Sequence, residues 1–131
     1  MKARAVDSNA IIDLFNGVGR TLEWMDCAER IVIPSIVIGE VLAGIEPTKR
    51  GAETRGAFES LLSLPQVAVA SVTKETARIY ASVFRHLSER GRPIPDSDMW
   101  IAACALEAGA TICTSDKHFD AIDSLSKVPA R

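Results

Sequence analysis

Apolar and polar residues alternate along the chain in two periods, one typical of short buried strands and one typical of helices. Strands are predicted at 4–7, 30–33, 66–72 and 111–114. Helices are predicted at 10–15, 20–28, 36–45, 49–64, 73–89 and 99–108, with a further short helix at 119–125. Because strands alternate with helices and no hairpin turn joins them, the pattern indicates an α/β fold. We expect a three-layer α/β/α arrangement with a central, mainly parallel sheet of four to five strands.

Small polar residues and glycines mark the ends of several predicted helices. Ser8 and Asn9 offer capping groups for the helix at 10–15, and Asp96 and Ser97 do so before the helix at 99–108. Gly109 ends that helix. Beyond Val128 no periodic pattern remains, and we expect a frayed end.

Length and composition indicate one domain over residues 1–131, since 131 residues with 47% apolar side chains can bury a sizeable core. The 15 basic and 17 acidic side chains give a net charge of −2, so the overall field does not attract nucleic acid. A polyanionic ligand therefore has to be held by local cations or through a metal ion.

Cysteine usage and hydropathy indicate a cytoplasmic protein without a membrane segment. Cys27, Cys104 and Cys113 are odd in number and lie in apolar patterns, which predicts reduced core residues. The longest apolar run, 31–45, is interrupted by proline, serine and glutamate, and no signal peptide precedes it.

Four carboxylates stand in apolar surroundings, namely Asp7, Glu40, Asp98 and Asp116. Asp7 and Asp116 follow predicted strands and Asp98 begins a helix, so these three are expected at the carboxyl edge of the sheet, where such folds bind ligands. Glu40 has no basic residue three or four positions away, which predicts that it faces the core or a pocket. Burial of an unpaired carboxylate costs several kcal/mol, roughly, unless a proton or cation compensates it.

Convergence of these acids predicts a metal site. Two carboxylates at ~4 Å repel by roughly 4 kcal/mol at an effective dielectric of 20, and a divalent cation removes that penalty. A set of oxygen ligands without histidine or cysteine favours Mg²⁺, with Mn²⁺ as a substitute, over zinc. Such an ion suits hydrolysis of phosphodiesters. Asp96 is a possible further ligand, although a capping role fits it better.

Structural roles are the alternatives for each acid. Asp7 can be a cap at the end of a strand, and Asp98 can be a first-turn acid that the helix dipole stabilises. Asp116 can be a turn residue, and Glu40 can belong to a buried ion pair. Asp13, four residues before a glycine, is expected to be solvated. The two histidines, His86 and His118, are expected to be surface or packing residues.

Four segments of the chain resemble the successive motifs of the PIN-domain family, and most closely its VapC-type toxins. These segments are Val-Asp-Ser-Asn-Ala-Ile-Ile-Asp at 6–13, Pro-Ser-Ile-Val-Ile-Gly-Glu-Val-Leu-Ala-Gly at 34–44, Pro-Asp-Ser-Asp-Met-Trp-Ile-Ala-Ala at 95–103 and Thr-Ser-Asp-Lys-His-Phe at 114–119. The resemblance implies a Mg²⁺-dependent endoribonuclease that leaves a 5′-phosphate, a homodimer, and a cognate antitoxin that blocks the site. It assigns the family acids to Asp7, Glu40, Asp98 and Asp116, with a hydroxyl residue, Thr114 or Ser115, beside the last.

Three functional classes are compatible with the residues. The first is the metal-dependent ribonuclease of a toxin-antitoxin pair, with flanking phosphates held by Arg92, Lys117, Lys49 and Arg50. The second is a non-catalytic, acid-lined binding module of the same fold. The third is an aspartate-based phosphoryl-transfer domain with Asp7 as nucleophile, in which Glu40 has no role. For the first class, the antitoxin is expected to carry a basic tail whose arginine enters the acidic site. Its apolar residues would lie in a groove formed by the helix after Pro34 and residues 49–58.

Overall fold

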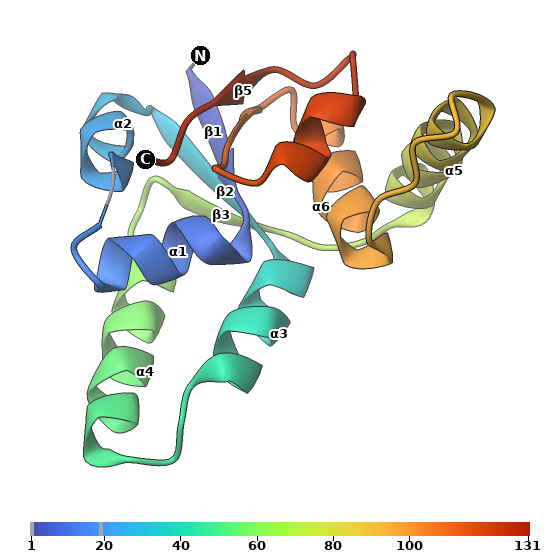
Figure 1. Cartoon of the computed structure of the whole chain (residues 1–131). Helices are drawn as coiled ribbons and strands as arrows, with labels where there is room; N and C mark the ends of the chain where they lie inside the picture. Colours follow the sequence, from blue (N-terminus) through green and yellow to red (C-terminus); the bar gives the residue numbers. More distant parts are fainter. Residues whose placement is uncertain (1, 19) are drawn as a thin grey trace.

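A sheet of five parallel strands forms the centre of the protein. The computed structural model describes residues 2–18 and 20–131. The strands are β1 (Ala3–Val6), β2 (Arg30–Pro34), β3 (Val67–Ala70), β4 (Thr111–Cys113) and β5 (Lys127–Val128). Their order across the sheet is β3-β2-β1-β4-β5 (Figure 1). In the central strand β1, Ala5 pairs with Val32 of β2 on one side and with Ile112 of β4 on the other.

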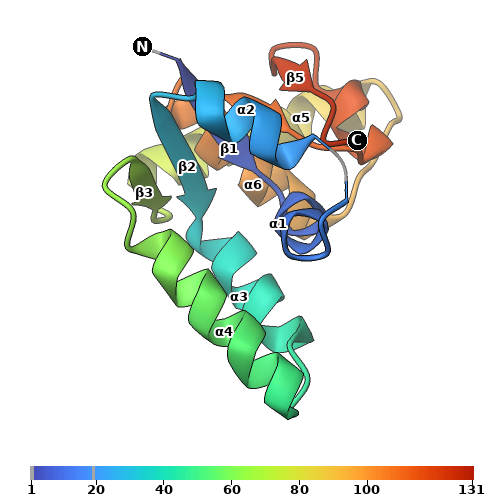
Figure 2. The same ribbon diagram turned by 90° about the vertical axis from the view of Figure 1, so that its left-hand side faces the viewer.

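Helices cover both faces of this sheet. Within the described residues they are α1 (Ser8–Phe15), α2 (Thr21–Cys27), α3 (Ser35–Gly44), α4 (Lys49–Leu62), α5 (Lys74–Glu89), α6 (Asp96–Glu107) and the 3-10 helix η1 (Lys117–Ala121). In Figure 2, α1 and α2 lie on the viewer's side of the sheet and α5 and α6 lie behind it. The predicted three-layer α/β/α fold with a parallel sheet is therefore confirmed.

The core is built from strand residues buried on both faces and from the buried apolar run of one helix. Consecutive residues of β2, from Ile31 to Ile33, are essentially inaccessible to solvent, as are Ala5 and Val6 of β1. In α6 the run 101–105 is equally buried. Continuous apolar strands of this kind require cover on both sides, and α6 supplies it behind the sheet. The carboxyl ends of β1 and β4 are consequently held in a rigid setting.

Helix starts differ from the predicted caps. Asp7, rather than Ser8 or Asn9, is the N-cap of α1, and its side chain accepts a hydrogen bond from the Ala10 amide. Helix α6 begins at Asp96 itself, after Pro95, so Asp96 is not a capping residue. Gly109 has a φ of 62°, which turns the chain from α6 into β4 and favours glycine there.

The last residues are ordered by pairing and by an ion pair, so the expected frayed end is wrong. Strand β5 pairs with β4, and Ala130 is buried. The guanidinium of Arg131 donates to both carboxylate oxygens of Asp13, with Nε–Oδ2 of 3.0 Å and an Nη2–Oδ1 distance of 2.9 Å. Asp13 is only 5% exposed, which contradicts the prediction that it is solvated. The local sequence pattern could not predict this ion pair, because Arg131 is 118 residues away from Asp13.

Another burial prediction needs correction. Cys104 and Cys113 lie in the core as predicted, but Cys27 is exposed at the end of α2. In α5, Val83 and Leu87 are buried while Ala77 and Phe84 are exposed, so only part of this helix's apolar surface is covered. The predicted helix at 119–125 is the shorter η1, and the strand at 66–72 is confined to β3.

Candidate functional site

Asp7 lies at the carboxyl end of β1 and is 4% exposed. Its Oδ1 accepts from the Ala10 amide at 2.9 Å, and its Oδ2 accepts from the hydroxyl of Thr114 just beyond β4. Burial is the main cause that raises its pKa, and the charges of Asp116 and Asp98 raise it further, while the two hydrogen bonds oppose the shift. The Thr114 hydroxyl also accepts from the Asp116 amide at 2.9 Å. One hydroxyl therefore links the ends of β1 and β4.

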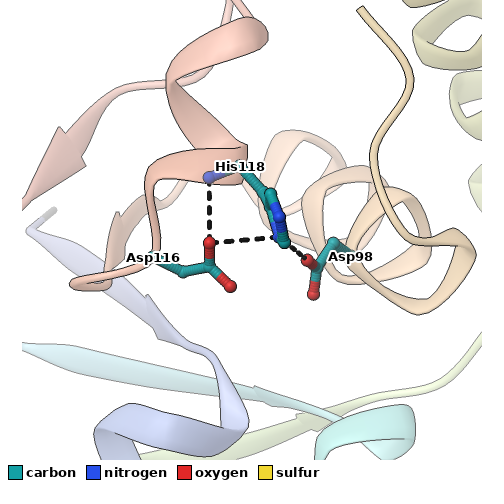
Figure 3. Close-up of side chains that lie close together, drawn as sticks. All are labelled: Asp98, Asp116 and His118. Atoms are coloured by element: carbon teal, nitrogen blue, oxygen red, sulfur yellow. Dashed lines mark hydrogen bonds and ion pairs between the residues drawn. The ribbon is translucent and has the colours of Figure 1, made fainter.

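Asp98 and Asp116 face each other across the imidazole of His118 (Figure 3). The His118 Nδ1 lies 3.0 Å from Asp98 Oδ2 and 3.1 Å from Asp116 Oδ1. Asp98 comes from the first turn of α6, and Asp116 is the N-cap of η1, where it accepts from the His118 amide at 2.9 Å. The side chains of Asp98 and Asp116 are 15% and 24% exposed, so solvent can reach both.

The electrostatics of Asp98 reflect a site rich in negative charge. Burial is the largest cause that raises its pKa, and the carboxylates of Asp116 and Glu40 raise it further. The hydrogen bond and charge of His118 oppose this shift. The carboxyl edge of the sheet thus carries carboxylates from α3, from α6 and from the turn between β4 and η1.

Glu40 lies in α3 and is exposed, so the prediction that it is buried in the core or a pocket is wrong. Its Oε1 accepts a hydrogen bond from Ser8 Oγ at 2.7 Å. Ser8 directly follows Asp7, and the charge of Glu40 acts on Asp98. These two observations place Glu40 near the acidic site, although among the described residues the group of atoms that could hold a metal ion does not include it.

Asp96 points to a different neighbour. Its carboxylate accepts from the phenol of Tyr80 on α5, and this hydrogen bond is the main cause that raises the pKa of Tyr80. Within the described residues, the groups that come together as a possible metal site are Asp98, Asp116 and His118, without Asp96. The Tyr80 ring also stacks on Trp100, with centroids 3.9 Å apart, so Asp96 helps to join α5 to α6.

His118 is the functional candidate that the sequence interpretation did not include. It is exposed, as predicted for a surface residue, yet its ring bridges two of the predicted acids. The spacing Asp116-Lys117-His118 could have indicated this role of His118. A residue two positions after an N-cap aspartate lies in the first helical turn, beside the carboxylate of that aspartate.

The donor set fits a divalent cation. One atom from each of Asp98, Asp116 and His118 lies within 4.8 Å of the other two. Two carboxylates suit Mg²⁺ or Mn²⁺, and both are under mutual repulsion that a cation relieves. The imidazole nitrogen widens the set beyond oxygen, so the sequence argument for oxygen-only ligands applies to the acids and not to His118.

The predicted basic residues lie in different places. Lys117 is beside Asp116, at the start of η1, and lines a cavity there. Lys49 and Arg50 are in the first turn of α4, and Arg92 is exposed after α5. Of these four, Lys117 is the one adjacent to the acidic cluster.

A groove of about 560 Å³ runs between α1, α3 and α4. Apolar side chains line much of it, including Ile12, Phe15, Val41 and Ile45, and Ile12 is 44% exposed. Arg50, Glu46 and Glu53 add charges along its lining. This groove corresponds to the one predicted from the helix after Pro34 and residues 49–58.

Comparison with known proteins gives consistent matches over nearly the whole chain. The curated Ribonuclease VapC5 of Mycobacterium tuberculosis is 26% identical over 110 residues, which cover 84% of this chain and 82% of that protein. The structure of VapBC-1 from nontypeable Haemophilus influenzae matches with a TM-score of 0.81 and 25% identity, covering 97% of each chain. VapBC2 from Rickettsia felis, solved with a DNA fragment from its promoter, matches with a TM-score of 0.83 and 21% identity over 98% of this chain and 99% of that chain.

Two further observations complete the description of the chain. Among the described residues, no helix combines the length and the apolar character required to cross a membrane. The family model for the PIN domain matches residues 4–125, which include all four predicted acids and His118. The chain therefore belongs to the PIN-domain family, and its relatives and structural neighbours include VapC-type proteins and their VapBC complexes.

Proposed function

We propose that this protein is a metal-dependent endoribonuclease, the toxin of a toxin-antitoxin pair. The observation that carries the proposal is the cluster of Asp98, Asp116 and His118 beside the buried Asp7, at the carboxyl edge of a PIN-domain sheet. A curated relative is named a ribonuclease, which supports the same activity here. Asp98 and Asp116 are the residues that would hold a divalent cation. When bound, Mg²⁺, or Mn²⁺ in its place, supplies a water of lowered pKa and shields charge on the phosphate.

The chain's own residues have distinct parts in this proposal. Asp7 adds negative charge behind Asp98 and Asp116 while the Thr114 hydroxyl and the Ala10 amide fix its position. Glu40, held at Oε1 by Ser8, presents Oε2 as an acceptor that can orient a water or take its proton. His118 shares its Nδ1 between two carboxylates and so keeps them in place.

The other two functional classes receive less support. A phosphoryl-transfer nucleophile has to reach the substrate, but Asp7 is 4% exposed and both of its oxygens accept hydrogen bonds. A pure binding module has no need for a carboxylate whose pKa is raised by burial and, further, by two neighbouring acids.

An assay of RNA cleavage tests the proposal. The wild type and the Asp98→Asn and Asp7→Asn variants are incubated with single-stranded RNA in Mg²⁺. We expect cleavage by the wild type and a loss of about 100-fold in each variant, because each removes a carboxylate that would hold the cation or support the residues that hold it. Asp26→Asn, which changes an exposed acid of α2, is the matched control and should cleave like the wild type. Equal activity in all four proteins would attribute the cleavage to a contaminant and refute the proposal.

The proposal includes an antitoxin with a basic tail. The structural neighbours from Haemophilus influenzae and Rickettsia felis are VapBC complexes, which supports a partner for this chain. An arginine of the tail would pair with Asp98 and Asp116, and its apolar residues would lie in the groove between α1, α3 and α4. A peptide from the neighbouring open reading frame should inhibit cleavage, and Arg→Ala in that peptide should weaken inhibition. Inhibition that is unchanged by this substitution, and by added Mn²⁺, would contradict the model.

A further inference from the structure

A cavity of about 420 Å³ opens beside Asp116, between the chain that follows β4 and the chain that follows β5. Its volume lies in the range of roughly 300–1,000 Å³ that is usual for small-ligand sites. Thr114 and Asp116 line this cavity and also belong to the acidic site. Through these two residues the cavity adjoins the acidic site.

The walls of the cavity are fixed by backbone pairing. The Thr114 amide donates to the Val128 carbonyl at 3.0 Å, and the Ala130 amide donates to the Thr114 carbonyl at 3.3 Å. The half-buried Lys127 directs its ammonium onto the Leu125 carbonyl at 3.1 Å, which holds this side chain in one position. A ligand that binds here would find preformed contacts.

The lining of the cavity includes cations that an anion can contact. Lys117, Lys127 and Arg131 contribute cations, and Asp120 is the acid that faces the cavity besides Asp116. Arg131 is already paired with Asp13. Within the part of the chain that the structure describes, no ion pair engages Lys117 or Lys127. Two ammonium groups are thus available to a ligand.

We propose that this cavity binds the phosphate adjacent to the scissile one in single-stranded RNA, with Lys117 and Lys127 as its contacts. The inference rests on the proposed ribonuclease function and specifies how the substrate is held. A protein with a net charge of −2 has to supply local cations for a polyanion, and lysine binds phosphate as a point charge. A fixed neighbouring phosphate sets the register of the scissile bond against Asp98 and Asp116.

The test measures RNA binding without metal, so that it does not depend on cleavage. The full chain and a Lys117→Gln, Lys127→Gln double variant are titrated into a fluorescent single-stranded RNA in EDTA, over a range of salt concentrations. Lys2→Gln with Lys74→Gln, which removes two exposed lysines elsewhere, is the matched control for net charge. A slope of about −0.7 in log K against log salt per phosphate corresponds to roughly fivefold in affinity at ~0.1 M salt, so loss of this one phosphate contact should weaken binding about fivefold and reduce the slope by about 0.7.

Each result decides between the two proposals. Restoration of affinity in Lys117→Arg with Lys127→Arg would support a charge contact and exclude a folding defect as the cause. If the glutamine variant binds RNA as tightly as the control pair, the phosphate site is refuted even where Mg²⁺-dependent cleavage persists. If the wild type binds RNA more tightly than the glutamine variant but does not cleave it, the phosphate site is supported and the nuclease is refuted. A wild type that does not bind RNA in EDTA refutes the phosphate site, and cleavage in Mg²⁺ then decides the nuclease separately.

Discussion

Neutralising Asp98 should stabilise the metal-free protein while abolishing its activity. Asp98 is 15% exposed and faces Asp116 across His118, and its pKa is raised by burial and by Asp116 and Glu40. A carboxylate whose pKa is raised in the folded state is less stable there as a charged group than in the unfolded chain. Asparagine removes that charge and keeps the shape of the side chain.

The magnitude follows from the distance between the two acids. Ligand atoms of Asp98 and Asp116 lie within 4.8 Å of each other. At that separation Coulomb's law gives a repulsion of about 3.5 kcal/mol for an effective dielectric of 20, and about 0.9 kcal/mol for bulk water. Loss of the attraction to His118 offsets part of this gain. We therefore expect Asp98→Asn to add about 1–2 kcal/mol, which for a domain of this size raises Tm by about 4–8 °C.

Thermal unfolding in EDTA at neutral pH is the appropriate measurement, with Asp26→Asn as the control for loss of one acid at an exposed position. The sign of the pH dependence is fixed by the raised pKa of Asp98. Below pH 3.8, the pKa of Asp98 in the unfolded chain, Asp98 is protonated in both states and the variant is no more stable than the wild type. The gain in free energy of unfolding develops as the pH rises through the raised pKa of the folded state. A variant that melts at or below the wild type at neutral pH, with the control unchanged, would show that Asp98 has a stabilising structural role and would refute the charged-site argument.

Three further results are expected. Mn²⁺ or Mg²⁺ at a tenfold excess over its Kd should stabilise the wild type by about 1.4 kcal/mol and so raise its Tm, and Asp98→Asn should show no such rise. A rise in Tm with zinc alone would refute the assignment to a hard ion. Gly51→Ala should destabilise the protein by about 1–3 kcal/mol in chemical denaturation, because a Cβ there would lie 1.8 Å from the Glu46 carbonyl oxygen. Gly56→Ala is the control, since a Cβ there would meet open space. Equal stability of the two variants would contradict the packing argument. We expect a homodimer that uses the exposed face of α5, so Phe84→Lys should elute as a monomer in size-exclusion chromatography, and an unchanged elution volume would exclude this face.

The position of the acids could be predicted from the sequence because it depends on local patterns. An aspartate directly after a buried strand has to emerge at the carboxyl end of that strand, which placed Asp7 and Asp116 at one edge once the strands were inferred to be parallel. Asp98 follows from the start of α6, whose apolar run is unambiguous. The four longer strands and the helices on both faces of the sheet follow from the same alternation, whereas the two-residue strand β5 leaves no periodic pattern in the sequence.

Features that depend on side-chain direction or distant partners could not be predicted in this way. Glu40 has no partner on its own helix, but its hydrogen-bond donor, Ser8, is 32 residues away and brings it to the surface of the site instead of the core. The ring of His118 reaches Asp98 only because η1 starts at Lys117 and turns the side chain toward α6. Residue spacing alone does not fix either orientation.

Asp7 and Asp13 illustrate how the structure separates a site residue from a structural one. Both belong to the same short motif, and both are nearly inaccessible, at 4% and 5% exposure. The fold supplies Asp13 with a guanidinium that contacts both of its oxygens, so its charge is compensated. Asp7 receives a hydroxyl and an amide, which are neutral donors, and has two further carboxylates as neighbours. Because stability alone would favour a cation beside Asp7 as well, the negative charge left uncompensated at this edge is consistent with the proposed role of these acids in holding a divalent cation.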